Sequence, residues 1–207
     1  VEYIRNLQSE GIKPRDIVIW LPPSYSDSSS KHYPVLYMHD GQNIFDPATS
    51  SFGVDWQIDE TADSMIKDGS IHEMIIVGIY NTDDRMLEYT MNPLADLYMK
   101  FVVNVLKPTI DNKYRTLPDK ENTATGGSSA GGLISFMLLW EYNNVFSKAA
   151  CLSPAFKIDI IDYVSSVLNT NSTKNIKVYI DNGGIGLEEK LQPGIDEMLE
   201  ALKAKGF

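Results

Sequence analysis

Short apolar segments alternate with longer segments of helical periodicity, and this alternation constrains the fold more than any other feature of the sequence. Several of the apolar segments are continuous and rich in β-branched residues, as expected of strands covered on both faces. The predicted strands are 16–22, 35–40, 74–80, 123–128, 148–153 and 177–181, and the predicted helices are 58–69, 95–111, 130–142, 158–169 and 193–206. We expect Pro193 to begin the last helix and Gly206 to end it. The alternation predicts a three-layer α/β/α sandwich with a mostly parallel sheet.

Chain length and charge narrow the classes of protein to consider. The 207 residues, 1–207, suit a single domain, because one hydrophobic core can reach that size before a chain divides. The net charge of -10, with no cluster of basic residues, argues against nucleic acid and anionic membranes as partners. The longest apolar runs fall far short of the ~20 residues of a membrane span. We therefore expect a soluble protein, either cytoplasmic or secreted after signal removal. The sequence does not determine its oligomeric state.

Metal and cofactor chemistry have little support in the sequence. The chain has one cysteine, Cys151, so it predicts neither an internal disulfide nor a cluster of thiolate ligands. It has no HExxH motif and no acidic loop of the calcium-binding kind. The glycine-rich segment GGSSAGG at 126–132 lacks the lysine of a phosphate-binding loop. We therefore expect no metal and no cofactor.

The same glycine-rich segment contains the motif GxSxG, which only Ser129 satisfies. Gly127 and Gly131 flank this serine at the correct distance, whereas Ser128 would need a glycine at Ala130. The motif is typical of a sharp turn between a strand and a helix, where the serine hydroxyl is exposed and can act as a nucleophile. The backbone N–H of Ala130 could then stabilise a developing oxyanion. The alternative is a glycine-rich turn that merely packs a strand against a helix.

Ligand sites of open α/β sheets lie beyond the carboxyl ends of the strands, so further site residues are expected there. The segment HDGQN at 39–43 follows a predicted strand, and Gly41 permits a tight turn that would aim the N–H of Gln42 at the site. An Asp-Gly turn that only ends the strand is an equally good explanation. The candidates for lining a substrate pocket are His39, Asp40, Trp56 and Phe156, although aromatic residues of this kind are common in cores.

Seven segments taken together resemble the putative esterase family of α/β-hydrolases, which includes esterase D, enterochelin-type siderophore esterases, and bacterial feruloyl or acetyl-xylan esterases. These segments are YPVLYMHDGQNIFD, WQIDE, IIVGIYN with RMLEY, LKPTIDNKYRTLPD, GGSSAGGL, VFSKAACLSPAF and VYIDNGGIGLEEKLQPGIDEM. The resemblance extends from about residue 15 to the end of the chain. It implies the α/β-hydrolase fold and a carboxylic ester hydrolase with Ser129 as nucleophile and Gln42 and Ala130 as oxyanion donors. The implied substrate is a small or carbohydrate-linked acyl ester.

The acid of a catalytic triad should follow the strand at 177–181, because the chain order of this fold is serine, acid, histidine. Asp181, Glu188 and Glu189 compete for this role. The resemblance favours Glu188, since the acid of family members follows a strand and a glycine turn. Alternatively, Glu188 and Glu189 form the charged first turn of a solvent-exposed helix.

The histidines depart from the family pattern. All three, His32, His39 and His72, precede Ser129, whereas family members carry the catalytic histidine after one more strand and then add a closing helix. We therefore expect the final strand and helix to be missing from residues 1–207 and this chain to be poorly active. His39 should brace the oxyanion loop, and the other two should be solvated. A hydrolase-like binding protein without turnover and an acyltransferase using the same nucleophile are the alternative functions.

Overall fold

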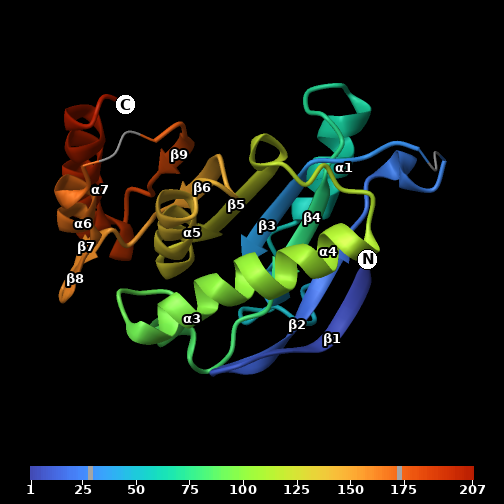
Figure 1. Cartoon of the computed structure of the whole chain (residues 1–207), viewed down its shortest axis with the longest axis horizontal. Helices are drawn as coiled ribbons and strands as arrows, with labels where there is room; N and C mark the ends of the chain where they lie inside the picture. Colours follow the sequence, from blue (N-terminus) through green and yellow to red (C-terminus); the bar gives the residue numbers. More distant parts are fainter. Residues whose placement is uncertain (28–29, 172–173) are drawn as a thin grey trace.

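A seven-stranded sheet forms the centre of the protein in the computed structural model, which describes residues 1–27, 30–171 and 174–207 (Figure 1). The two strands at one edge are antiparallel to their neighbours, and the five strands from β4 to β9 are mutually parallel. In spatial order the strands are β1 (Glu2–Ser9), β2 (Ile12–Trp20), β4 (Ile75–Ile79), β3 (Val35–His39), β5 (Thr123–Ser128), β6 (Lys148–Leu152) and β9 (Lys177–Asp181). The predicted α/β fold with a mostly parallel sheet is confirmed.

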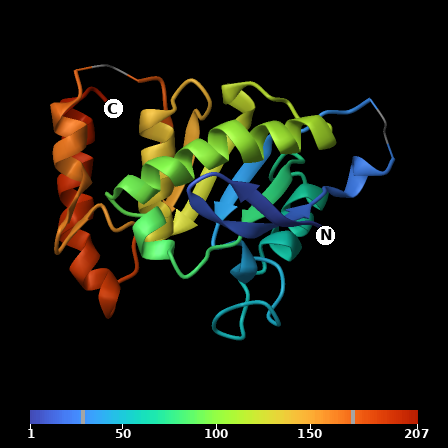
Figure 2. The same cartoon turned by 60° about the horizontal axis from the view of Figure 1, so that its bottom comes forward.

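Helices cover both faces of this sheet (Figure 2). They are α1 (Ile58–Lys67), α2 (Arg85–Glu88), α3 (Pro93–Phe101), α4 (Lys107–Lys113), α5 (Ala130–Glu141), α6 (Tyr163–Asn169) and α7 (Leu187–Ala204). The helices α3, α4 and α5 lie on one face, and α1 lies on the other (Figure 2). A two-stranded ribbon of β7 (Lys157–Ile158) and β8 (Ile161–Asp162) precedes α6.

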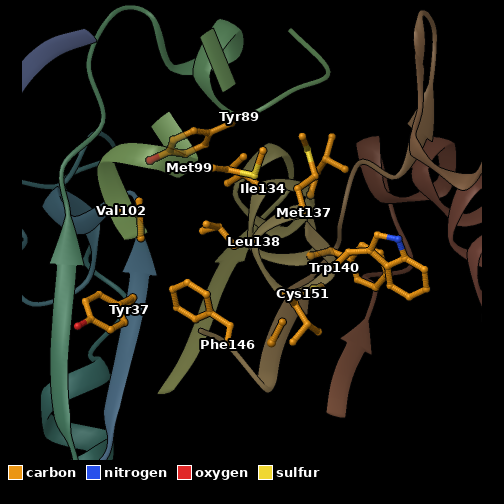
Figure 3. Packing of buried hydrophobic residues seen from close by; sticks show 14 of the residues in the cluster. Tyr37, Tyr89, Met99, Val102, Ile134, Met137, Leu138, Trp140, Phe146 and Cys151 are labelled. Atoms are coloured by element: carbon orange, nitrogen blue, oxygen red, sulfur yellow. The ribbon is translucent and has the colours of Figure 1, made fainter. Parts of the chain in front are cut away.

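The two faces of the sheet bury separate hydrophobic clusters because neighbouring side chains of a strand point to opposite faces. In β3, Val35 and Tyr37 belong to the larger cluster, and Met38 belongs to the smaller one together with Ala62 of α1. Helix α5 is buried along nearly its whole length, and Figure 3 shows its Ile134 and Leu138 within the larger cluster. These continuous apolar runs made the central strands and this helix recognisable in the sequence.

Several elements differ from the sequence-based prediction. Strand β1 was not predicted, because its side chains are mostly polar or only half-buried at the sheet edge. The predicted helix at 158–169 is helical only from Tyr163 onward, where the side chain of Asp162 accepts a hydrogen bond from the N–H of Ser165 and caps the helix. The residues before it form β7 and β8 instead.

Two helices near proline residues also differ. Helix α7 begins at Leu187, so Pro193 lies inside it and the prediction that this proline begins the helix is wrong. The segment predicted as one helix at 95–111 is divided into α3 and α4 by a π-helical turn, Val102–Leu106. That turn immediately precedes α4, which contains Pro108, and a proline ring clashes with the carbonyl four residues earlier in a regular α-helix.

Among the described residues, none of the helices combines the length and the apolar character that a membrane crossing requires. The assignment of residues 1–207 to a single domain stays a prediction.

Candidate active site

Ser129 occupies the sharp turn between β5 and α5, as the GxSxG motif predicted. Its backbone has φ 59 and ψ -121, a conformation that side-chain-bearing residues rarely adopt and that costs about 1–3 kcal/mol. Surrounding backbone hydrogen bonds hold Ser129 in this strained conformation. The N–H of Ser129 donates to the carbonyl of Leu152 at 2.9 Å, and the carbonyl of Ser129 accepts from the N–H of Ala155 at 3.1 Å. The turn is therefore tied to the end of β6.

The two glycines of the motif lie where space is tight, because the backbone before the serine touches the first turn of α5. A Cβ atom at Gly127 would lie 2.7 Å from the carbonyl oxygen of Gly131. A Cβ atom at Gly131 would lie 3.2 Å from a carboxylate oxygen of Asp40. The first contact is with backbone, which cannot move aside, so Gly127 is sterically required, whereas a side chain at Gly131 would need Asp40 to shift.

The segment after β3, which we call the oxyanion loop (residues 40–43), lies beside this turn. Asp40 has a left-handed backbone with φ 60, and Gly41 crosses β4 so closely that a Cβ atom there would lie 2.4 Å from the carbonyl carbon of Gly78. The N–H groups of Gln42 and Ala130 have no hydrogen-bond acceptor within the described part of the chain. Both amides are therefore free to donate to a ligand, and their role as oxyanion donors stays a prediction.

A cleft of ≈ 370 Å³ opens at Ser129. Its lining residues come from the loop that follows β3, from the segment between β4 and the start of α2, and from the end of β5 and the turn after it: Asp40, Asn43, Ser51, Phe52, Trp56, Asn81, Arg85, Ser128 and Ser129. The cleft thus brings together the predicted residues Ser129, Asp40 and Trp56. Larger clefts lie between α6 and α7 and between α3 and α5, but Ser129 lines neither of them. We therefore place the candidate active site in the smaller cleft.

Sequence reasoning missed several of these lining residues. Asn81 and Arg85 follow β4, whose carboxyl end shares an edge of the sheet with β5, so the rule that ligand sites lie beyond strand ends could have found them. Asn43 gives no such signal. Its side-chain oxygen accepts from the N–H of Ser51 at 2.9 Å, and its carbonyl accepts from the N–H of Trp56 at 2.8 Å. Asn43 thereby holds the loop that carries Phe52 and Trp56.

Asp40 is the most strongly bonded polar side chain of the cleft. Its two carboxylate oxygens each accept one hydrogen bond from Arg85, from Nε and Nη2, both at 2.7 Å. One of them also accepts from Nδ2 of Asn81 at 2.6 Å. The Asp40 side chain is only 4% exposed, whereas that of Arg85 is 27% exposed. The pair is therefore a bidentate ion pair at the wall of the cleft.

His39 does not line the cleft, so its assignment to the substrate pocket is wrong. Its ring is completely buried between Tyr98, whose hydroxyl lies 2.8 Å from Nδ1, and Thr125, whose hydroxyl lies 3.3 Å from Nε2. Burial lowers the pKa of His39 from 6.5 to about 3, so the ring is neutral at physiological pH. These contacts hold the end of β3 directly before the oxyanion loop. His32 and His72 are exposed, as expected.

Phe156 also lies away from the cleft, and its assignment to the substrate pocket is wrong. It is fully buried, and its ring meets that of Phe136 in α5 edge to face at a centroid distance of 5.1 Å. The chain turns inward here because the N–H of Ala155 is bonded to the carbonyl of Ser129. The aromatic residue that follows is thereby directed under α5 and into the core.

Of the three candidate acids, Asp181 is the last residue of β9, and Glu188 and Glu189 lie in α7, which follows it. Asp181 accepts a hydrogen bond from the N–H of Ser153 at 3.3 Å. Glu188 is half-buried in the first turn of α7, beside Gly183, where an added Cβ atom would lie 2.9 Å from Cγ of Glu188. Glu189 is exposed. None of the three is hydrogen-bonded to a histidine in the described residues, so the choice of Glu188 stays a prediction.

Three further carboxylates gather next to the cleft wall. Asp55, Asp59 and Glu60 have oxygens within 4.8 Å of one another. Burial, followed by a hydrogen bond with Glu60, raises the pKa of Asp59 to about 6. Groups of partly exposed carboxylates are common in proteins that bind no ion, so the cluster does not by itself indicate a metal site.

The neutral state of His39 predicts a specific loss of stability in acid. Below about pH 6.5 the unfolded chain protonates this histidine, whereas the folded chain does so only near pH 3. Stability should therefore fall by up to about 1.4 kcal/mol per pH unit across this window because of His39 alone. Urea unfolding at several pH values between 7 and 4 should show a shallower decline for His39→Gln than for the unmodified protein. His32 is exposed, so His32→Gln should lose stability with falling pH as steeply as the unmodified protein. The same decline of stability with pH in all three proteins would contradict the prediction.

Comparison with known proteins gives a match to a family model described as "Putative esterase" over residues 12–196. The chain is 28% identical over 193 residues to a protein of Xylanibacter ruminicola described as an endo-1,4-beta-xylanase/feruloyl esterase. That match covers 91% of this chain and 25% of the relative. The chain thus spans about a quarter of the length of the curated relative that it matches.

Solved structures show the same fold. An IroE-like serine hydrolase from Shewanella oneidensis superposes with a TM-score of 0.74 at 24% identity, covering 97% of this chain and 69% of the other. A ferulic acid esterase gives a TM-score of 0.77 at 20% identity, covering 99% and 86%. The enterobactin esterase FES from Shigella flexneri, crystallised in the presence of enterobactin, gives a TM-score of 0.75 at 18% identity. That match covers 100% of this chain and 50% of the other.

Proposed function

The chain belongs to the putative esterase family, and from that premise we propose that it is a serine carboxylic ester hydrolase that acts through an acyl-enzyme on Ser129. One observation carries the proposal. The only serine that satisfies GxSxG sits at a strained turn between strand and helix and lines a cleft, and the backbone amides of Ala130 and Gln42 have no hydrogen-bond acceptor among the residues that the structure describes. A turn that merely packed a strand against a helix would have no need to hold a serine in that conformation at a cleft.

The proposed reaction has two stages. The hydroxyl oxygen of Ser129 attacks the ester carbonyl, a base takes the hydroxyl proton, and the carbonyl oxygen becomes an oxyanion. The amides of Gln42 and Ala130 donate to this oxyanion, at the positive end of the α5 dipole. The alcohol leaves with a proton, and water then cleaves the acyl-enzyme to release the acid. Serine needs a base for this attack, normally a histidine oriented by an acid, for which we propose Glu188.

The proposed substrates are small or carbohydrate-linked acyl esters. The cleft volume of ≈ 370 Å³ is sufficient for a small acyl group, and two aromatic residues, Phe52 and Trp56, form part of its wall. Phe52 is 87% exposed at the rim, where an aromatic ring can stack on the flat face of a sugar or an aryl group. The names of the similar proteins, which include feruloyl, ferulic acid and enterobactin esterases, agree with this substrate class.

One observation favours a second candidate, a hydrolase-like binding protein without turnover. Within the described residues, no histidine lines the cleft at Ser129, and the buried His39 is engaged by Tyr98 and Thr125. An acyltransferase would use the same serine and differ only in the group that accepts the acyl unit.

Fluorophosphonate labelling and p-nitrophenyl acetate turnover test these proposals on the 207-residue chain and on the full product of its gene. We expect the full product to hydrolyse the ester and to carry the label on Ser129. The 207-residue chain should turn over slowly, because none of its histidines lines the cleft, retaining a residual rate of about 10³–10⁴-fold over water from the oxyanion donors and pocket. Absence of both labelling and turnover in the full product would contradict the hydrolase and support the binding protein. Rapid transfer of the acetyl group to an added sugar would indicate the acyltransferase.

A further inference from the structure

We propose that Arg85 and Asn81 are positioning residues that hold the oxyanion loop in its donating geometry by clamping Asp40. The inference rests on the proposed function, since the loop matters only if Gln42 donates to an oxyanion. Neither residue needs to touch the reacting atoms for this role. They act through Asp40 and Gln42, to which they are hydrogen-bonded on the two sides of Gly41.

The conformation of Asp40 is one that such hydrogen bonds stabilise. Its left-handed backbone, φ 60 and ψ 43, is less favourable than the common helical and extended conformations, although aspartate tolerates it better than most residues with a side chain. The three hydrogen bonds to its carboxylate, two from Arg85 and one from Asn81, fix the side chain in one place. A planar guanidinium that binds both oxygens fixes orientation as well as distance. Without them, the backbone at Asp40 is free to relax toward a commoner conformation and to turn the following amides.

A second tie holds the other side of the same turn. The backbone N–H of Asn81 donates to the side-chain oxygen of Gln42 at 3.2 Å. Gly41, between Asp40 and Gln42, lies against the backbone of Gly78 in β4. The oxyanion loop is therefore fixed to the end of β4 at three consecutive residues, Asp40, Gly41 and Gln42. The rigid sheet thereby defines the direction of the backbone N–H of Gln42.

The clamp also relates the loop to the nucleophile. A carboxylate oxygen of Asp40 lies 3.2 Å from the position of a Cβ atom at Gly131, in the first turn of α5. Asp40 thus packs against the helix whose first amide, that of Ala130, is the other proposed donor. A carboxylate so close to a developing oxyanion would oppose it electrostatically unless it is neutralised. The guanidinium of Arg85 supplies the neutralising charge at 2.7 Å.

Arg85→Met in the full gene product tests the inference by steady-state kinetics with p-nitrophenyl acetate. We expect kcat to fall by about 10²-fold, because displacement of an oxyanion donor is felt in the transition state, while KM changes by less than about threefold. Arg85→Lys should be intermediate, since lysine restores the charge but not the bidentate geometry. The double variant Asp40→Asn/Arg85→Met should be no slower than the slower of the single variants Asp40→Asn and Arg85→Met, because each single substitution already removes the same clamp. Arg5→Met removes an exposed ion pair with Asp16 and should leave kcat unchanged.

Hydrogen exchange provides a readout that does not depend on turnover. In Arg85→Met, peptides covering residues 40–46 should exchange faster, while peptides covering α7 should not change. Unchanged kcat, or unchanged exchange in the oxyanion loop, would overturn the inference, as would a loss of kcat that Arg85→Lys does not partly restore. If the full product shows no Ser129-dependent turnover, the proposed function fails, whereas the exchange experiment still decides whether Arg85 holds the loop.

Discussion

Ser129→Ala is expected to reduce kcat/KM for p-nitrophenyl acetate by at least about 10⁴-fold in the full gene product, because it removes the atom that forms the acyl-enzyme. The fold should be unaffected. Alanine in the strained turn keeps the backbone hydrogen bonds that Ser129 makes to Leu152 and Ala155, which involve no side-chain atom. The melting temperature should therefore change by only a few degrees, which separates loss of the nucleophile from loss of structure.

Two other serines provide the comparison for this variant. Ser128 precedes the nucleophile and also lines the cleft, so Ser128→Ala decides which serine reacts, and we expect it to cost less than about tenfold. Ser26 is exposed, its hydroxyl is bonded only to Asp27 among the described residues, and Ser26→Ala should have full activity. Fluorophosphonate should label Ser128→Ala and Ser26→Ala but not Ser129→Ala. Retention of activity by Ser129→Ala, or its loss only in Ser128→Ala, would refute the assigned nucleophile.

Glu88→Ala should produce a large loss of stability, because Glu88 is half of a fully buried ion pair. Glu88 and Arg15 form an ion pair whose side chains are both 0% exposed, joined at 2.9 Å and 2.5 Å by two guanidinium nitrogens. Removing one partner leaves a buried charge without compensation, which costs about 3–5 kcal/mol. For a chain of this size that corresponds to a fall in melting temperature of about 6–20 °C.

Urea unfolding of matched variants checks this expectation. Asp16→Ala breaks the exposed pair with Arg5 and should cost less than about 1 kcal/mol. The double variant Arg15→Met/Glu88→Leu should recover most of the stability, because apolar side chains can replace a buried ion pair without leaving a charge behind. A loss below about 1 kcal/mol for Glu88→Ala alone, or a double variant less stable than Glu88→Ala, would show that the pair does not contribute as its burial implies.

The parts of the fold that the sequence predicted correctly are those with a strong local signal. Strands β3, β4 and β6 and helix α5 are largely apolar runs, and β5 and β9 lead into a glycine-rich turn and a glycine-rich loop. The boundaries of all six elements agree with the prediction within about two residues. Elements at the periphery carry weaker signals. Strand β1 is largely polar, and the ribbon of β7 and β8 is only two residues long in each strand, so neither shows a period that can be recognised.

The sequence by itself determined the family, the α/β class and the position of Ser129, because strand and helix periods and the glycines of a tight turn are local requirements. Only the tertiary structure decided which side chains meet at the cleft. Asp40 is joined there to Asn81 and Arg85, some forty residues away along the chain, because β3 and β4 are neighbours in the sheet. His39 and Phe156 were assigned to the cleft from their places near strand ends, but they point into the core. The direction of a side chain at a strand end depends on packing against segments distant in the sequence, and no local pattern contains that information.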